Sequence, residues 1–136
     1  MLANGAKLGV KKKGGAQYVD LPGLKELPEM GVDPEKVENT SLTDKVKQYE
    51  MGIGDAGDMA YTFKYDNSGA GTAYRLLKEI EESGEAADFV ETLKDGTKTS
   101  FKAEVSVKRT GGGVNGVIDC VANMALQSEL EVVDPA

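Results

Sequence analysis

Two stretches of strictly alternating side-chain type constrain the fold of this chain more than any other feature. Residues 59–66 read MAYTFKYD, in which large apolar or aromatic residues alternate with smaller or polar ones. Residues 101–108 read FKAEVSVK and alternate in the same way. A period of two places successive side chains on opposite faces of a β-strand. Both stretches therefore predict strands that turn one face to a core.

Weaker signals predict further extended segments. Alternation recurs in residues 117–126 and 128–133, and residues 87–93 are rich in apolar residues. Two prolines in residues 17–30 favour an edge strand or extended chain over a helix. Residues 35–42 fit a short strand. The chain is thus expected to be mainly β.

Two connections carry turn signals. Asp95-Gly96 predicts a two-residue hairpin of type I′, which requires positive φ at both positions. Gly111, Gly113 and Gly116 match the G-x-G-x-x-G dinucleotide fingerprint, but that motif must open a helix inside a βαβ unit. Only 20 residues follow Gly116, and they are rich in β-branched residues. We interpret these glycines as a flexible connection between two strands.

One amphipathic helix is predicted at about residues 70–83. Its apolar residues follow the i, i+3, i+4, i+7 spacing and are expected to pack on the sheet: Ala73, Leu76, Leu77 and Ile80. Ser68 or Thr72 can cap its start, and Gly84 can end it.

These elements predict an α+β, mainly β fold: an antiparallel β-sandwich or barrel with one flanking helix. Residues 1–16, rich in Gly, Ala and Lys, are expected to form a flexible arm. Residues 17–136 are expected to form a single domain with a long loop at residues 43–58.

Catalytic signals are weak. The chain has no histidine, which excludes Ser-His-Asp and Cys-His sites, and its single cysteine, Cys120, lies in an apolar strand pattern. The stretch GIGDAGDM, residues 52–59, lacks the ligand spacing of a calcium loop. A small carboxylate-based hydrolase is a distant alternative, since alternation separates its acidic residues. We therefore expect no enzyme, no cofactor and no metal.

Charge is unevenly distributed along the chain. Residues 1–19 contain four lysines and no acid, whereas the other residues contain 12 basic and 23 acidic side chains, a balance of −11. This pattern suggests either self-association between copies or a solvated tail. A net charge of −7 argues against general affinity for nucleic acid. No apolar stretch is long enough for a signal peptide or a membrane span.

The order of these features resembles the major tail tube proteins of long-tailed bacteriophages, over roughly residues 8 to 133. The matching residues are Leu24, Leu27, Pro28, Glu29, Val37, Glu38, Thr40, Leu42 and Asp44, then Asp95-Gly96-Thr97, then Ser128-Glu129-Leu130. Thr43 stands between Leu42 and Asp44, where a shorter spacing is usual.

The resemblance implies a structural subunit whose fold is shared with contractile-tail and type VI secretion tubes. Six copies would form a ring whose sheets join into one inner barrel. Rings would stack around a tape measure protein, end at tail terminator and distal tail proteins, and conduct DNA without binding it. The protein would be assembled in the host cytoplasm and reside in the virion tail, away from membranes. The alternative is a single-ring head–tail connector or tail terminator of related fold.

Residue roles in such a tube can be expected by region. Ring-to-ring contact is expected from the long loop, with the arm 1–16 and the tail 129–136 as partners; the residues named for it are Lys11, Lys12, Lys13, Asp44, Lys45, Lys47, Tyr49, Met51, Asp55 and Asp58. Polar strand positions are candidates for the lumen, where acidic charge would repel DNA: Lys102, Glu104, Asp119 and Asn123.

Overall fold

A computed structural model describes residues 1–12, 14–31, 33–38, 49–55 and 58–135. In chain order, its elements are β1 (Lys7–Lys11), β2 (Val19–Asp20), β3 (Leu24–Glu26), β4 (Asp33–Glu38), β5 (Tyr49–Asp55), β6 (Asp58–Lys64), α1 (Ala73–Ser83), β7 (Ala87–Thr92), β8 (Lys98–Thr110), β9 (Asp119–Leu126) and β10 (Glu131–Val133). The predicted fold class, mainly β with one helix and an antiparallel sheet, is confirmed.

The main sheet is curled, and a short segment of the chain connects its two ends. Its strand order is β2-β1-β7-β8-β9-β6-β3, and β10 pairs with β8 beyond the end of β9. β2 and β3 lie at the two ends of this order, yet only residues 21–23 separate them in the sequence. The Leu21 N–H donates to the Leu8 carbonyl at 2.8 Å, and the Lys64 N–H donates to the Gly23 carbonyl at 2.8 Å. One bent segment therefore joins both ends of the curled sheet.

The inward faces of the strands form one core. The predicted alternation places Met59, Tyr61 and Phe63 of β6 inside. The Phe101 ring of β8 stacks between Tyr61 and Phe89, with ring centroids 6.3 and 5.5 Å apart. Such aromatic burial supplies a large share of the hydrophobic stabilisation of a small domain.

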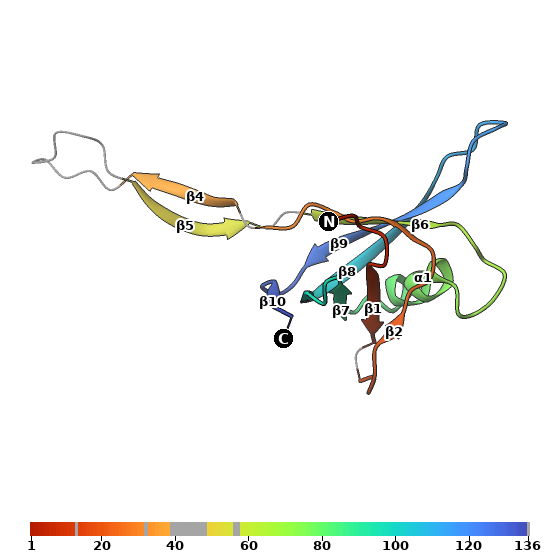
Figure 1. The fold of residues 1–136 in the computed structure, drawn as a ribbon, viewed down its shortest axis with the longest axis horizontal. Coiled ribbons are helices and arrows are strands. Elements are labelled where there is room, and N and C mark those ends of the chain that lie inside the picture. Colours follow the sequence, from red (N-terminus) through yellow and green to blue (C-terminus); the bar gives the residue numbers. More distant parts are fainter. Residues whose placement is uncertain (13, 32, 39–48, 56–57, 136) are drawn as a thin grey trace, which may run out of the picture.

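Helix α1 packs its apolar side on this core. Ala73, Leu77 and Ile80 are buried, and Leu76 is partly buried against the same cluster. Figure 1 shows α1 beside the curled sheet, next to β8. Thr72 stands at the N-cap position, but its hydroxyl donates to the Gly69 carbonyl instead of capping the helix. Gly84 ends the helix in the left-handed conformation, as predicted.

The prediction of a flexible arm over residues 1–16 is wrong for residues 7–11. These residues form β1, which pairs with β7 along its whole length and places Leu8 and Val10 in the core. Lys7, Gly9 and Lys11 alternate with the apolar Leu8 and Val10, so a period of two is present in the sequence. This alternation marks a core strand only because residues 7–11 pair with β7, which lies far along the chain.

The long loop at residues 43–58 is also corrected in part. Residues 49–55 form β5, which pairs antiparallel with β4 from Glu38↔Tyr49 to Asp33↔Asp55, and Asp58 begins β6. Figure 1 shows this two-stranded ribbon extending away from the main sheet. Of the ring-contact candidates, Tyr49, Met51 and Asp55 lie in β5; Lys13, Asp44, Lys45 and Lys47 lie outside the described residues.

The hairpin at Asp95-Gly96 exists, but its turn type differs from the prediction. Only Gly96 has positive φ, 99°, and the Gly96 N–H donates to the Leu93 carbonyl at 3.0 Å. The Leu93 N–H donates to the Thr97 carbonyl at 2.9 Å. This is a three-residue loop with glycine in the left-handed position. Asp95 keeps negative φ, and its carboxylate accepts the Thr97 N–H at 2.9 Å.

Candidate assembly surfaces

The glycine-rich segment joins β8 to β9 and projects beyond the sheet. The last strand pair is Thr110↔Asp119, and residues 111–118 continue outward as the loop at the upper right of Figure 1. Gly111 has a φ of 87°, and a Cβ added there would lie 2.2 Å from the Val117 carbonyl oxygen. The loop leads into an antiparallel strand instead of a helix, so a dinucleotide site is excluded.

The outer face of β8, β9 and β6 carries small and polar side chains. Cross-strand rows on this face include Ser106–Asn123–Ala60 and Thr110–Asp119–Lys64. Among the described outward positions of these strands, Val121 is the one larger aliphatic residue. All four lumen candidates lie on this face: Lys102 and Glu104 are exposed, and Asp119 and Asn123 are half-buried.

Charges of both signs lie on this face. Lys25 of β3 places its ammonium group 3.0 Å from each carboxylate oxygen of Asp119. Lys64, Lys102 and Lys108 add positive charge, and Glu104 is negative. The acidic excess of the chain therefore does not come from this face, and a DNA-repelling lumen would need other residues.

Besides the ends of the two sheets, β8 and β10 each have an edge without a partner among the described residues. β7 pairs only with Lys98–Ala103, so the edge of β8 on that side is unpaired from Glu104 to Thr110. β10 pairs with β8 on one side, and all three of its residues are exposed. Unpaired N–H and C=O groups at such edges are ready to bond another strand.

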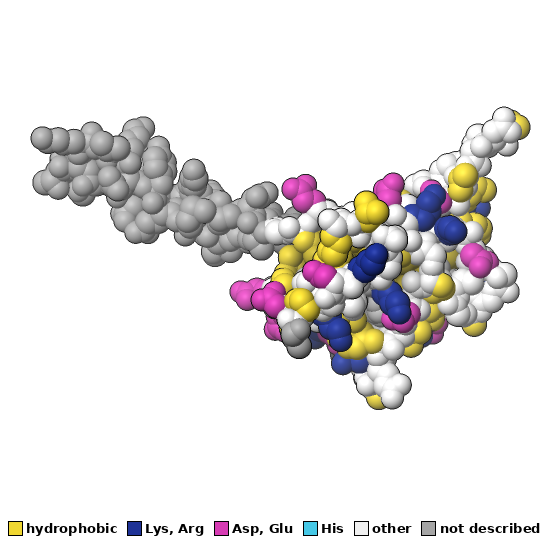
Figure 2. Space-filling view, in the orientation of Figure 1, with side chains coloured by type: hydrophobic (Ala, Val, Ile, Leu, Met, Phe, Trp, Pro, Cys, Tyr) yellow, Lys and Arg dark blue, Asp and Glu magenta, His cyan; other side chains and the backbone are white. Residues whose placement is uncertain are grey.

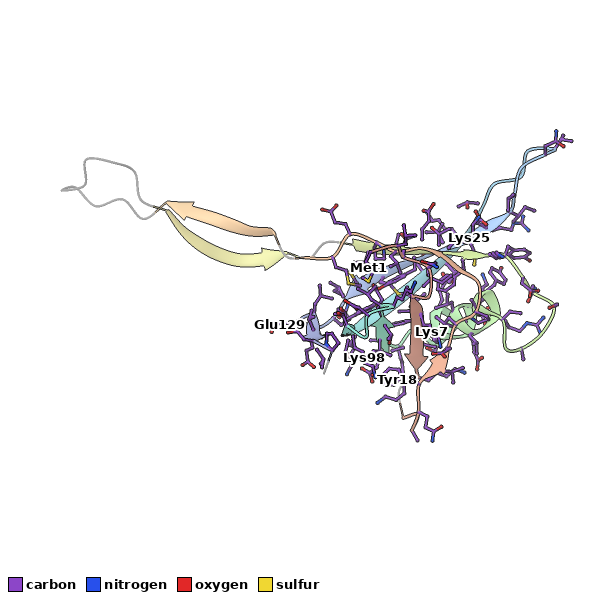
Figure 3. All side chains as sticks on the ribbon, viewed as in Figure 1. Met1, Lys7, Tyr18, Lys25, Lys98 and Glu129 are labelled. Carbon is purple, nitrogen blue, oxygen red and sulfur yellow. The ribbon has the colours of Figure 1, made fainter. Side chains whose placement is uncertain are left out.

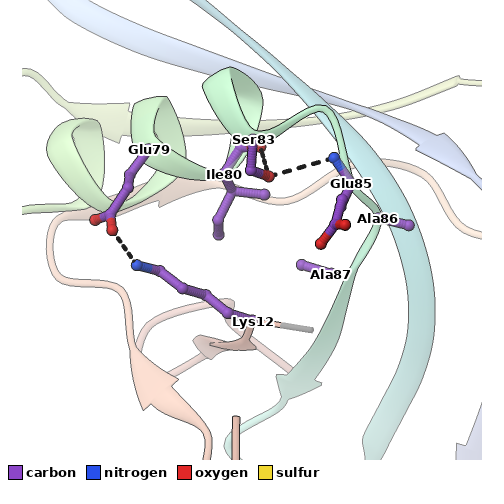
Figure 4. A pocket seen from close by; sticks show the side chains of 7 residues that line it. All are labelled: Lys12, Glu79, Ile80, Ser83, Glu85, Ala86 and Ala87. Carbon is purple, nitrogen blue, oxygen red and sulfur yellow. Dashed lines mark hydrogen bonds and ion pairs between the residues drawn. The ribbon is translucent and has the colours of Figure 1, made fainter. Parts of the chain in front are cut away.

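Two of the predicted ring-contact lysines already have partners within the chain. Lys12 forms an ion pair with Glu79 of α1 across a shallow pocket of about 220 Å³, which is also lined by Ile80, Ser83 and Ala87. Figure 4 shows this pair linking the segment after β1 to the helix. The Lys11 ammonium lies 5.1 Å from the centre of the Tyr18 ring. Both lysines help to fix the N-terminal segment to its own subunit.

The two ends of β8 differ in charge. Lys108 and Arg109, near the glycine-rich loop, are exposed, while Glu129, Glu131 and Asp134 are exposed around β10. Figure 3 shows Lys25 toward the loop end and Glu129 at the opposite end, together with Lys98. Figure 2 shows acidic side chains gathered at that opposite end. The surface is therefore more basic at the loop end of β8 and more acidic at its β10 end.

The core holds titratable groups but no catalytic arrangement. Burial raises the pKa of the Cys120 thiol, and the charge of Asp119 adds to this rise. The Tyr61 hydroxyl donates to Glu91 in the interior. Within the described part of the chain, no three His, Cys, Asp or Glu side chains come close enough together to hold a metal ion.

The described residues thus form a curled antiparallel sheet with one helix, unpaired strand edges and a projecting hairpin. The chain belongs to the family described as "Phage tail tube, TTP, lambda-like", whose sequence model matches residues 1–110. The protein is therefore a structural subunit of a phage-type tail tube, located in the virion tail, and not an enzyme.

Solved structures share the fold. A chain from the tail of an empty gene transfer agent particle, refined with C6 symmetry, is 20% identical, with a TM-score of 0.72 over 97% of this chain and 99% of that one. A chain from the six-fold symmetrised baseplate of the anti-feeding prophage is 8% identical, with a TM-score of 0.76 over 98% of this chain and 95% of that one.

A chain from an extracellular contractile injection system, in a structure of its sheath/tube terminator, is 8% identical, with a TM-score of 0.69 over 98% of this chain and 96% of that one. A comparison with curated protein sequences found no significant match. In the described residues, the single helix of 11 residues is too short to cross a bilayer.

Proposed function

We propose that copies of this chain close into rings of six and that the rings stack head to tail into a hollow tube. Family membership supports a tube subunit, and two of the solved structures with the same fold have six-fold symmetry. The unpaired edge at Glu104–Thr110 gives neighbouring sheets a place to join. Joining sheets around a ring removes exposed edges, which otherwise invite uncontrolled association.

The observation that carries this proposal is the polar outer face of β8, β9 and β6. A sheet buried on one face only has its other face in water. In a ring, we place this face on the lumen, with Lys102, Glu104, Asp119 and Asn123 lining the channel. The tape measure protein would occupy the channel during assembly, and DNA would pass later. This face carries charges of both signs, so it would attract the DNA phosphates only weakly and DNA could slide past it. The strong repulsion that the net charge of the whole chain suggests would then be absent from the channel.

Stacking needs a second contact, between rings. The β4–β5 ribbon extends from the sheet and is the natural candidate, together with the rest of residues 43–58. Contacts between unlike surfaces do not close and so generate filaments. The tail terminator and distal tail proteins would cover the unlike surfaces left at the two ends.

Negative-stain electron microscopy of the purified, concentrated chain tests the proposal. We expect long hollow tubes, with six-fold symmetry in end-on views. Single rings that never stack would favour a connector or terminator, a role favoured by the fold shared with a chain of a terminator complex. A monomer at every concentration would contradict both functions.

A variant separates stacking from ring closure. Replacing residues 33–55 with a short Gly-Ser linker removes the β4–β5 ribbon and leaves the strands of the main sheet intact. We expect a folded subunit, with a cooperative melting transition in circular dichroism, that forms rings but no tubes. Tubes of normal length from this variant would rule out the ribbon as the ring-to-ring contact.

A further inference from the structure

The glycine-rich loop presents aliphatic side chains to solvent at the end of a shaped turn. Val114 is fully exposed, and Val117 and Ile118 are 69% and 42% exposed. The Gly116 N–H donates to the Gly113 carbonyl at 2.9 Å, which places Val114 and Asn115 at the tip. Figure 2 shows hydrophobic atoms at the end of this projection. A turn that holds aliphatic residues outward is suited to insertion into a partner.

A second aliphatic pair lies at the other end of β8. This strand has 13 residues, roughly 40 Å at about 3.3 Å per residue. Its last residue, Thr110, leads into the loop, and its first residues pair with β10, where Val132 and Val133 are 60% and 59% exposed. Outside residues 32–58, whose side chains are not described, the other exposed large hydrophobic residues belong to the N-terminal segment: Met1, Leu2, Tyr18 and Val19.

Charges flank the two aliphatic sites with opposite sign. Lys108 and Arg109 stand at the base of the loop, where Asp119 is neutralised by Lys25. Arg109 also lies 5.9 Å from the centre of the Tyr65 ring, which holds it on this side. Three exposed acids lie around β10, namely Glu129, Glu131 and Asp134. Lys98, paired with Val133, and Lys94 of the neighbouring hairpin offset them only in part, since Asp95 of the same hairpin is also exposed. Complementary charge on unlike surfaces orients two copies head to tail.

We propose that residues 111–118 of one subunit dock on β10 of a second copy, in the next ring of the tube. Val114 and Val117 pack on Val132 and Val133 of that copy, and the basic base of the loop faces its acidic residues. The proposal rests on the proposed stacking and names a contact for it separate from the β4–β5 ribbon. The glycines, which resemble a nucleotide motif, serve to shape a protein contact.

Cysteine cross-linking tests this pairing directly. The double variant Val114→Cys with Val132→Cys is expected to give a ladder of covalent multimers on a non-reducing gel after mild oxidation. Each single variant is expected to stop at dimers, because a subunit with one accessible thiol can form only one disulfide with another subunit. The native Cys120 is buried and stays unreactive. The matched control, Val114→Cys with Val19→Cys, uses an equally exposed valine and should give no ladder.

A second measurement uses tube length. Val114→Ser with Val117→Ser is expected to leave rings intact and to shorten tubes at least tenfold in negative-stain images, while Val19→Ser gives tubes of normal length. If the unaltered protein forms tubes but the 114/132 pair gives no ladder, or if the serine variant forms full-length tubes, the docking is overturned and stacking stands. If the unaltered protein forms no tubes and no ladder, the proposed function fails as well.

Discussion

The Tyr61 hydroxyl donates a hydrogen bond of 2.6 Å to Glu91 Oε2 in the interior of the curled sheet. Tyr61 is fully buried, and Glu91 is only 5% exposed. Burial raises the pKa of the Glu91 carboxyl, and the hydrogen bond from Tyr61 partly opposes that rise. Burial and the nearby carboxyl raise the pKa of Tyr61 as well. This bond links β6 to β7 through side chains across the core.

Removing the hydroxyl with Tyr61→Phe leaves the ring stack in place but takes away the partner of a buried carboxyl. Leaving such a group unsatisfied costs about 1–3 kcal/mol of unfolding free energy. We expect a loss of that size in urea denaturation at pH 7. Tyr18→Phe, on an exposed tyrosine, is the matched control and should leave stability within about 0.5 kcal/mol. Equal effects of the two changes would show that the buried bond contributes nothing.

Glu91→Gln should change how stability depends on pH. Because the folded pKa of Glu91 is raised, its contribution is fully present below the unfolded pKa and is lost as pH rises through the folded value. Glutamine resembles the protonated acid and does not titrate. The variant should therefore gain stability relative to the unaltered protein as pH rises from 4 to 8, measured by urea denaturation at each pH. A constant difference across this range would contradict a raised pKa.

Gly111→Ala should disturb the glycine-rich loop. Positive φ disfavours alanine by about 1–2 kcal/mol, and the added Cβ would also meet the Val117 carbonyl oxygen. We expect a lower melting temperature and increased amide exchange in residues 111–118. Gly113→Ala is the matched control, since a Cβ there meets no atom within 4 Å. An unchanged melting temperature for Gly111→Ala would mean that the loop backbone adapts freely.

Leu77→Asp places a charge in the core beneath α1. Leu77 is fully buried, and an unpaired buried charge is among the most destabilising of single changes. We expect loss of the cooperative melting transition in circular dichroism. Lys78→Asp, at the next and exposed position of the same helix, should keep that transition. A normal melt for Leu77→Asp would contradict the packing of the helix.

Local alternation allowed the central strands and their faces to be predicted. In residues 59–65 and 101–108, large apolar side chains at every second position indicate strand and core side together. Helix α1 was recognisable because its apolar residues have helical spacing and Gly84 follows directly after its last residue. The Asp95-Gly96 hairpin was located correctly, but turn type depends on which hydrogen bonds close the loop, and the Asp95 carboxylate stabilises the longer form.

The N-terminal strand and β5 were missed because their partners are distant or their composition is misleading, whereas the short strand expected at residues 35–42 overlaps β4. Leu8 and Val10 are two apolar residues among lysines and glycines, and only pairing with β7 makes them core. Tyr49, Met51 and Ile53 alternate with other residues in β5, a signal hidden by the glycines around them. The tail 129–136, which contains β10, was expected to take part in ring-to-ring contact, but the glycine-rich loop was not, because the exposure of Val114 cannot be derived from local pattern.

The bent segment between β2 and β3 has a consequence for the timing of folding. β1 pairs with β7, and β3 pairs with β6. The ribosome makes β6 and β7 after the first strands, so these two pairings cannot form while the N-terminal part of the chain is being made. Contacts between distant parts of a chain also form slowly. β1 and β3 can therefore take their places in the main sheet only after β7 and β6 have been made, and a chain interrupted before β7 lacks the strand with which β1 pairs.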